Sequence, residues 1–274
     1  NMRIVNLVED TDAENDCLCE HGLSYYVETE RHRILVDTGA SDMFMRNAKT
    51  LGINMNRVDT LILTHGHYDH AGGILPFADR NFEAKIFIHR AAAGEYYSVH
   101  GNDRRYIGID KQILMLPQVR FLSDSFRLDE EVFVFSNITG KKFWPVGNYQ
   151  LKEKKGDDYV QDTFAHEQCV VIESDGKRIL MSGCAHNGIL NILSRYREFY
   201  DSDPDIVISG FHMKKDEEYS AGEIEIIRET ARQLDKMKTK FYTGHCTGEE
   251  AYRIMKRILE DKLIWIQSGE EIRL

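Results

Sequence analysis

Three histidines and one aspartate fall within six consecutive positions of the chain, in the run THGHYDHAGG at 64–73. The pair His65 and His67 can direct two imidazoles at one metal ion from a single turn. Asp69 and His70 then offer an oxygen and a nitrogen to a second ion. Because imidazole and carboxylate ligands suit zinc, iron or manganese, the run predicts two metal half-sites rather than a loop of solvated side chains.

The elements around this run place it at the end of a strand. An apolar stretch at 58–63 precedes the histidines and glycines follow them, as is typical of a strand that ends in a polar turn. His186 and His245 also follow predicted strands, at 178–182 and 240–243, on turns that contain glycine. We therefore expect these two histidines to complete the metal sites. The alternative for each is a histidine held by hydrogen bonds in a polar pocket.

Cys184 and His186 lie two residues apart, and in an extended stretch such positions face the same side. Both can therefore point at a metal. A nitrogen from His186 would complete a three-imidazole set with His65 and His67, which is the arrangement of many catalytic zinc sites. A thiolate would be a softer and more oxidisable ligand. We therefore expect His186 to be the ligand, with Cys184 close by but unbound or weakly bound.

The run at 64–73 resembles the His-x-His-x-Asp-His signature of the metallo-β-lactamase superfamily, and the resemblance extends over the whole chain. The segments VDTG at 36–39, GCAH at 183–186 and GHCTG at 244–248 resemble the other superfamily motifs. This resemblance implies an α/β fold, the αββα sandwich of two mixed sheets flanked by helices. It also implies that Asp37 accepts a hydrogen bond from a ligand imidazole and fixes its orientation. The alternative is that Asp37 caps its own turn.

Two further segments, EHGLS at 20–24 and GFH at 210–212, extend the resemblance to one branch of the superfamily. Members of this branch are commonly labelled 7,8-dihydropterin-6-methyl-4-(β-ribofuranosyl)aminobenzene 5′-phosphate synthases. The resemblance implies a transfer that involves a phosphoribosyl donor and an aromatic amine. No residue of the chain identifies a pterin or aminobenzoate pocket.

Several other side chains have two interpretations each. His212 follows a predicted strand and could contact substrate or replace His245 as a ligand. His89 ends a strand and could line the substrate pocket or be structural. His166 lies where many superfamily members place a ligand, but the sequence around it does not match their pattern. Arg104 and Arg105 could bind an anion, although an exposed charged pair is the preferred interpretation.

The organisation of the chain predicts one domain, 2–274, with an inserted region at about 91–161. Within that region the charged stretch 152–158 is predicted to be a mobile surface loop. The strand–turn segments at 34–40 and 179–185 resemble each other, which suggests two packed sheets with helices outside and a site where their strand ends meet. Capping boxes are predicted to begin two helices, one with Ser220 and Glu223, the other with Thr247 and Glu250.

The composition excludes several classes of protein. The net charge of −10 argues against non-specific binding to nucleic acid or to an anionic membrane. No run of 18 apolar residues predicts a membrane span, and no secretory signal is visible. The five cysteines do not have the spacing of a disulfide framework, so we expect reduced thiols and a cytoplasmic protein.

A metal pair of this type lowers the pKa of a bridging water to roughly 7 and supplies hydroxide at neutral pH. Asp69 could orient that hydroxide, and no nucleophilic serine motif, phosphate loop or dinucleotide fingerprint competes with this interpretation. The sequence therefore predicts a hydrolase-like enzyme with two divalent metals, zinc being expected, that acts on a small phosphorylated or ester-bearing metabolite. The alternatives are the synthase-type transferase and a metal-dependent sensor or binding module without turnover.

Overall fold

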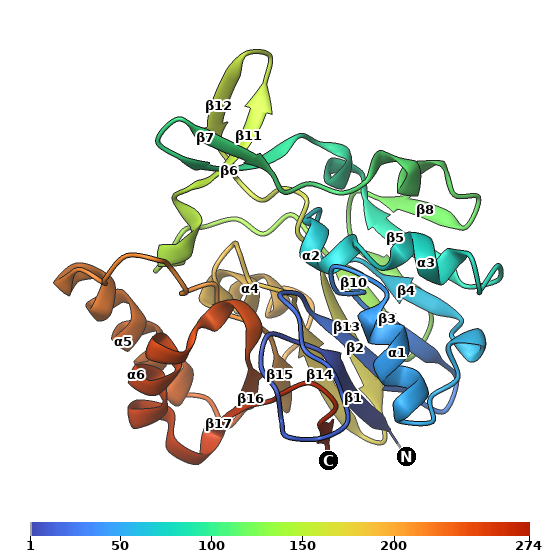
Figure 1. Ribbon diagram of the computed structural model, residues 1–274. Helices are drawn as coiled ribbons and strands as arrows, with labels where there is room; N and C mark the ends of the chain where they lie inside the picture. The colour runs from blue at the N-terminus through green and yellow to red at the C-terminus, as the bar shows by residue number, and fades with distance from the viewer. Residues whose placement is uncertain (1) are drawn as a thin grey trace.

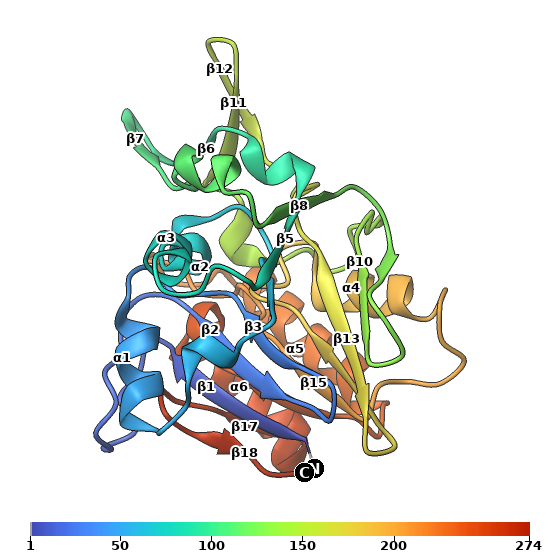
Figure 2. The same cartoon turned by 90° about the vertical axis from the view of Figure 1, so that its right-hand side faces the viewer.

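The apolar runs of the N-terminal half form most of a seven-stranded mixed sheet in the order β18-β1-β2-β3-β4-β5-β8, and the C-terminal strand β18 completes one edge. The computed structural model describes residues 2–274 (Figure 1, Figure 2). Strands β1, β2 and β3 are antiparallel neighbours, whereas β3, β4, β5 and β8 run parallel. Their bounds are β1 (Arg3–Val8), β2 (Ser24–Glu28), β3 (Arg33–Val36), β4 (Thr60–Ile62), β5 (Lys85–His89), β8 (Val119–Leu122) and β18 (Glu271–Ile272).

The second half of the chain forms most of another seven-stranded mixed sheet, in the order β17-β16-β15-β14-β13-β10-β9. Strands β14 to β17 are parallel to one another, and β9, β10, β13 and β14 are antiparallel neighbours. Their bounds are β9 (Phe126–Arg127), β10 (Val132–Phe135), β13 (Cys169–Ser174), β14 (Lys177–Met181), β15 (Ile206–Ile208), β16 (Lys240–Thr243) and β17 (Leu263–Trp265).

The two sheets share one layer of apolar side chains. Ile34 and Ile62 of the first sheet and Val170 and Ile208 of the second are buried members of this layer. Full burial of one such aliphatic side chain is worth roughly 1.5–3 kcal/mol, so the shared layer holds the sheets together. In β3 the alternate residue Leu35 belongs instead to a cluster on the outer face. Both faces of this strand are therefore buried, which explains its continuous apolar run.

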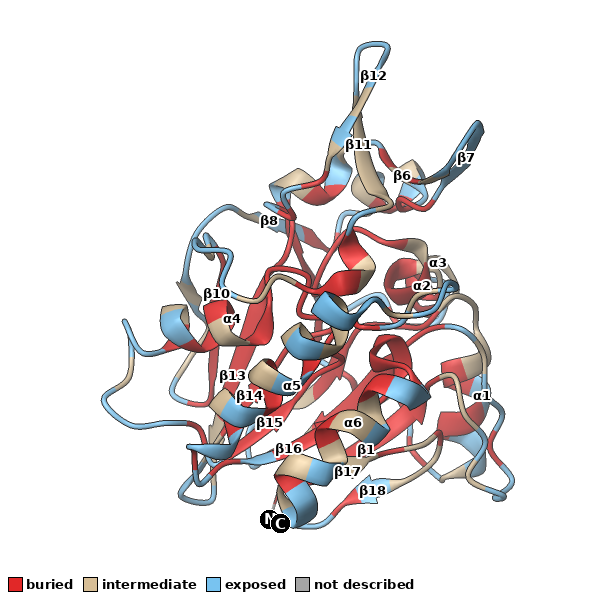
Figure 3. Ribbon diagram, turned by 90° about the vertical axis from the view of Figure 1, so that its left-hand side faces the viewer, coloured by how far each residue is buried: buried red, intermediate tan, exposed pale blue. Residues whose placement is uncertain are grey.

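Helices cover both outer faces, with the first sheet packed against α1 (Met43–Thr50) and α3 (Ile74–Ala78). The second sheet packs against α4 (Ile189–Tyr196), α5 (Ala221–Asp235) and α6 (Glu249–Leu259). Figure 3 shows buried residues concentrated in the strands of the two main sheets, and exposed residues on the outer sides of α5 and α6 and in the surface loops. The predicted αββα sandwich is confirmed. Among residues 2–274, no helix combines the length and the apolar character that a membrane span requires.

The region 91–161 is divided between the sandwich and a third sheet. Strands β8, β9 and β10 belong to the two main sheets. The rest forms a four-stranded antiparallel sheet that projects from the top of the molecule in Figure 1. Its strands are β6 (Tyr96–His100), β7 (Asp103–Tyr106), β11 (Leu151–Lys155) and β12 (Asp158–Gln161). The prediction of a loop at 152–158 was wrong, because β11 and β12 pair there as a hairpin around Gly156, whose φ is +62°.

The turn that carries the histidine run packs closely against the loop that follows β3. The backbone N–H of Thr38 donates to the carbonyl oxygen of His70 at 2.7 Å. A Cβ atom added to Gly72 would lie 2.1 Å from the carbonyl oxygen of Ala40 and 2.5 Å from its carbonyl carbon. The absence of a side chain at Gly72 therefore lets the two loops meet.

We expect Gly72→Ala to lower the free energy of unfolding by about 1–3 kcal/mol, because the new methyl group overlaps backbone that cannot rotate away. The matched control is Gly222→Ala in the first turn of α5, where an added Cβ meets only the Ser220 hydroxyl at 3.9 Å. This control should gain about 0.4–1 kcal/mol. Urea unfolding of both variants measures the difference, and equal stabilities would contradict the close contact.

His32 lies in the turn between β2 and β3, between carboxylates that belong to different sheets. Its Nδ1 is 2.7 Å from Asp59 Oδ1, next to β4, and its Nε2 is 2.5 Å from Asp129 Oδ2, near β10. Burial lowers the pKa of His32, but the hydrogen bonds to Asp129 and Asp59 outweigh burial and raise the pKa above 6.5. The protonated imidazole thus links the two sheets.

A group whose pKa is raised on folding stabilises the protein fully below its unfolded pKa, and this stabilisation is lost as the pH rises through its folded pKa. We therefore expect wild type to exceed His32→Gln in unfolding free energy by roughly 1–3 kcal/mol at pH 6. The advantage should shrink as the pH rises above 6.5. Urea unfolding across pH 5.5–9 measures it, and an advantage that grows with pH would refute the charged link.

Candidate metal centre

Asp37 organises the histidine run from the end of β3. Its side chain is fully buried and its φ is +64°. The carboxylate accepts hydrogen bonds from the backbone N–H and the hydroxyl of Thr64, both at 2.7 Å. Its Oδ2 also lies 2.7 Å from His70 Nδ1. A carboxylate only accepts, so Nδ1–H of His70 donates, and Nε2 is directed towards His245. The contact between Asp37 and an imidazole is the one implied by the family resemblance.

The first cluster comprises His65, His67 and His186, and we call it the three-imidazole group. Their ring nitrogens lie within 4.8 Å of one another. All three Nε2 atoms are buried, and none has a hydrogen-bond partner among residues 2–274. An unpaired buried polar atom costs about 1–3 kcal/mol, so three of them at one point form a donor set that fits a divalent cation.

The other ring nitrogen is fixed in two of these histidines. His65 Nδ1 is 3.0 Å from the Thr64 hydroxyl, and His186 Nδ1 is 3.0 Å from Asn148 Oδ1. Burial and then the neighbouring imidazoles hold the pKa of His65 and of His186 well below the usual range. Burial followed by His166 lowers the pKa of His67 to about 3. All three rings are therefore neutral at pH 7, which is the form that binds metals.

The second cluster comprises Asp69, His70 and His245, and we call it the mixed group. Asp69 Oδ2 lies 3.1 Å from His245 Nε2 and 3.5 Å from His70 Nε2, and the two Nε2 atoms are 3.2 Å apart. Ligands on one tetrahedral zinc ion are separated by roughly 3.3 Å. Burial raises the pKa of Asp69, but His70 and His245 outweigh it and hold the pKa well below the usual range. The carboxylate is thus ionised and available to a cation.

Cys184 lies between the two groups. Its Sγ is 3.2 Å from His70 Nε2. It also shares one possible ligand set with His65 and His70 and another with His186 and His212. Burial raises the pKa of the Cys184 thiol well above 9. The structure thus places both Cys184 and His186 at the metal-binding groups. Of these two residues, only His186 belongs to the three-imidazole group.

Sequence reasoning missed Asp10, which supports the mixed group. Asp10 Oδ1 lies 2.6 Å from His245 Nδ1, and Oδ2 lies 2.9 Å from Nδ1 of His21. Asp10 thus orients His245 as Asp37 orients His70. The position of Asp10, soon after the apolar strand β1, could have identified it as a candidate site residue. Asn148 was also missed, and it lies in a stretch without clear periodicity.

The ambiguous histidines separate into distinct roles. Both nitrogens of His166 are used, because Nδ1 accepts from the backbone N–H of Gly66 at 2.8 Å and Nε2 lies 3.0 Å from Asp162 Oδ2. His89 Nδ1 accepts from the backbone N–H of Ala91 at 3.0 Å, and His89 does not line the cavity at the cluster. His212 does line that cavity, with its ring 4.2 Å from the ring of His186. His212 forms a possible ligand set with Cys184 and His186, whereas His245 lies against Asp69 and His70.

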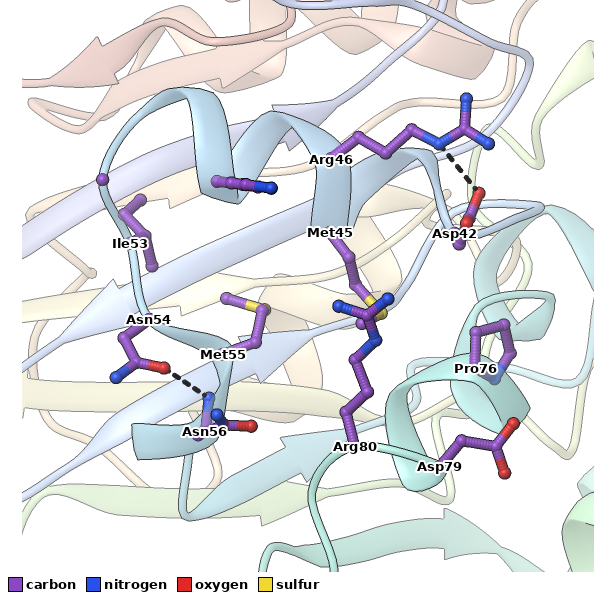
Figure 4. A pocket seen from close by; sticks show the side chains of 12 residues that line it. Asp42, Met45, Arg46, Ile53, Asn54, Met55, Asn56, Pro76, Asp79 and Arg80 are labelled. Atoms are coloured by element: carbon purple, nitrogen blue, oxygen red, sulfur yellow. Dashed lines mark hydrogen bonds and ion pairs between the residues drawn. The ribbon is translucent and has the colours of Figure 1, made fainter.

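The cavity above the two groups has a volume of about 100 Å³. It is lined by His21, His67, Tyr68, Asp69, Ser98, Arg105, Ile107, Leu151, Cys184, His186, His212, His245 and Cys246. A larger hollow of about 710 Å³ lies beside α1 and α3 (Figure 4). Its lining includes the paired Asp42 and Arg46 but no histidine or cysteine. The small cavity is therefore the candidate site.

These features are two neighbouring groups of potential metal ligands beside one cavity of an αββα sandwich, and the family comparison agrees with this fold. The model of the Metallo-beta-lactamase superfamily matches residues 18–211, so the chain belongs to this superfamily.

Particular relatives span the whole chain. The crystal structure of Tm1679, described as a metal-dependent hydrolase of the β-lactamase superfamily, is 30% identical with a TM-score of 0.82, and the match covers 100% of this chain and 99% of that one. The 7,8-dihydropterin-6-methyl-4-(β-D-ribofuranosyl)-aminobenzene-5′-phosphate synthase of Methanocaldococcus jannaschii is 28% identical over 295 residues, covering 100% of this chain and 97% of the relative. Zinc-bound PqqB from Methylobacterium extorquens, 14% identical with a TM-score of 0.61 over 99% and 100% of the chains, shares the fold.

We expect His186→Ala to remove most of the metal that the three-imidazole group holds, since two imidazoles remain there. Cys184→Ser should keep most of the metal. Elemental analysis of both variants after mild purification with zinc measures the contents, and circular dichroism checks that each is folded. If Cys184→Ser loses the metal and His186→Ala retains it, the assignment is reversed.

Proposed function

We propose that this protein is a metal-dependent hydrolase that uses two divalent cations, with zinc the expected metal and iron or manganese the alternatives. The observation that carries the proposal is the set of buried, unpartnered Nε2 atoms of His65, His67 and His186 next to the mixed group. Two such donor sets at one cavity favour a dinuclear centre. A cavity lined by His67, Asp69, His186 and His245 favours a catalytic site over a closed structural site, and therefore favours an enzyme over a binding module.

When bound, the cations would lower the pKa of a water nucleophile and polarise an oxygen of the substrate. The chain supplies the rest of the chemistry. Asp37 and Asp10 hold Nδ1–H of His70 and His245, so that each Nε2 faces the cluster. The Asp69 carboxylate lines the cavity and is ionised, so it can hold a cation and accept a hydrogen bond that orients the attacking water. This assigns to Asp69 the role of positioning the nucleophile.

The small cavity limits what can reach this chemistry. A volume of about 100 Å³ accommodates a reacting group and little more. We therefore propose a small phosphorylated or ester-bearing metabolite whose remainder lies towards the third sheet. The free thiols of Cys184 and Cys246 at the cavity support a reducing compartment such as the cytoplasm. The net charge of −10 favours a small molecule over nucleic acid or a membrane as partner.

A synthase-type transferase is the second candidate. It is favoured by the full-length similarity to the M. jannaschii synthase. Hydrolysis needs water as the acceptor, whereas the transferase needs an aromatic amine and a phosphoribosyl donor. Incubation with an ester or phosphodiester panel, and separately with 4-aminobenzoate and a phosphoribosyl donor, distinguishes the two.

The protein as purified with zinc is expected to bind about two metal ions per chain, and Asp69→Ala is expected to stay folded. This variant should lose most of its activity, by at least about 10²-fold, because Asp69 both holds a cation and orients the attacking water. Elemental analysis gives the metal count, and a hydrolase screen on phosphodiesters, lactones and thioesters provides the substrate. A folded wild type that takes up no metal would refute the dinuclear centre. Near-normal turnover by Asp69→Ala would refute its role.

A further inference from the structure

The third sheet is fastened to the histidine run at the mouth of the cavity. The backbone N–H of Tyr68, between His67 and Asp69, donates to the carbonyl oxygen of Ile107 at 2.9 Å, just after β7. The N–H of Ile107 in turn donates to the carbonyl oxygen of Tyr96 in β6 at 2.8 Å. Strands β6 and β7 are therefore held in a fixed position beside the metal-binding groups.

One face of this sheet points into the cavity. Ser98 is paired with Arg105 on β7 and with Leu151 on β11, so the three side chains form a row across one face. All three line the cavity. The next residue, Arg104, lies on the opposite face, and its guanidinium carbon is 4.5 Å from the ring centroid of Tyr159. Both arginines are exposed, as expected from the sequence, but only Arg105 lines the cavity.

Arg105 has no anionic partner in the part of the chain that the structure describes. No carboxylate of residues 2–274 forms an ion pair with it, and its guanidinium carbon lies 5.9 Å from the ring centroid of Tyr68. Among the lining residues of the cavity it is the only lysine or arginine. The guanidinium presents several N–H donors in a planar fork that matches the oxygens of a phosphate or carboxylate.

We propose that Arg105 binds an oxyanion group of the substrate, a phosphate or a carboxylate that is separate from the group at the metal cluster. This inference rests on the proposed function, because it assigns two separate binding points to the substrate of that enzyme. The metal-binding groups hold the reacting end, and Arg105 holds the charged end against the third sheet. Arg105 is in this sense a specificity-determining residue, and Arg104 is not.

Binding tests the proposal without turnover. Succinate carries a second carboxylate that butyrate lacks, and 3-phosphonopropionate carries a phosphonate in its place. In calorimetry with the zinc-loaded protein, wild type should bind at least one of the two dianions about tenfold more tightly than butyrate, as a charge-assisted hydrogen bond allows. Arg105→Gln should reduce this preference to about one, and Arg104→Gln should keep it. The dianion that binds more tightly identifies the preferred oxyanion. A preference that survives in Arg105→Gln, or is absent in wild type, overturns the proposal.

Kinetics separates this inference from the proposed function. With mono-4-nitrophenyl succinate, Arg105→Gln should raise KM about tenfold, whereas KM for 4-nitrophenyl acetate should stay within twofold of the wild-type value. Arg104→Gln should change neither. If wild type hydrolyses neither these esters nor any substrate of the hydrolase screen but the binding preference depends on Arg105, the hydrolase proposal fails and the anion site stands. If Arg105→Gln impairs both esters equally, the anion site is refuted even though the protein is a hydrolase.

Discussion

The carboxylate of Asp37 is the constraint on which the site depends. It accepts hydrogen bonds from the backbone and hydroxyl of Thr64 and from the imidazole of His70, all within a fully buried space. Removal of this carboxylate would leave several buried donors without a partner, each at a cost of about 1–3 kcal/mol. The same contacts set the direction of the turn after β4 and the tautomer of His70. One side chain thereby couples the fold of the first sheet to the chemistry of the cavity.

A second aspartate repeats this arrangement from β1. Asp10 contacts His245 and His21. Each of the two histidines of the mixed group is therefore oriented by an aspartate that follows a strand. Glu9 adds a backbone contact, accepting from the N–H of His245 at 2.8 Å. His245 has a positive φ of 50°, a conformation that costs energy outside glycine, and these hydrogen bonds offset that cost. The carboxylates of Asp10 and Glu9 thus hold His245 in this conformation.

The sequence allowed prediction of what depends on local spacing. The capping box of Ser220 and Glu223 follows from a short-range pattern, whereas the sandwich and the contact of Asp37 with an imidazole were implied by the family resemblance. The structure contains all three. The box proposed at Thr247 was wrong. Its hydroxyl instead accepts from the N–H of Phe211 and contacts the Thr243 hydroxyl, and Gly248 caps α6. The third sheet was missed because its strands are half-exposed and rich in charge, which is the pattern of a loop. Asn148 could not be found, since only the folded chain brings it to His186.

The side chains of the metal-binding groups come from widely separated parts of the chain, from His65 to His245. A cation shared by them closes loops of more than a hundred residues, in the manner of a reversible crosslink. Because the unfolded chain cannot assemble these donors, the native state gains about 1.4 kcal/mol for each tenfold rise in free metal above the dissociation constant of a site. The resistance of the protein to heat and to proteases would then vary with the metal supply of its surroundings, and chelators would act on it as denaturants.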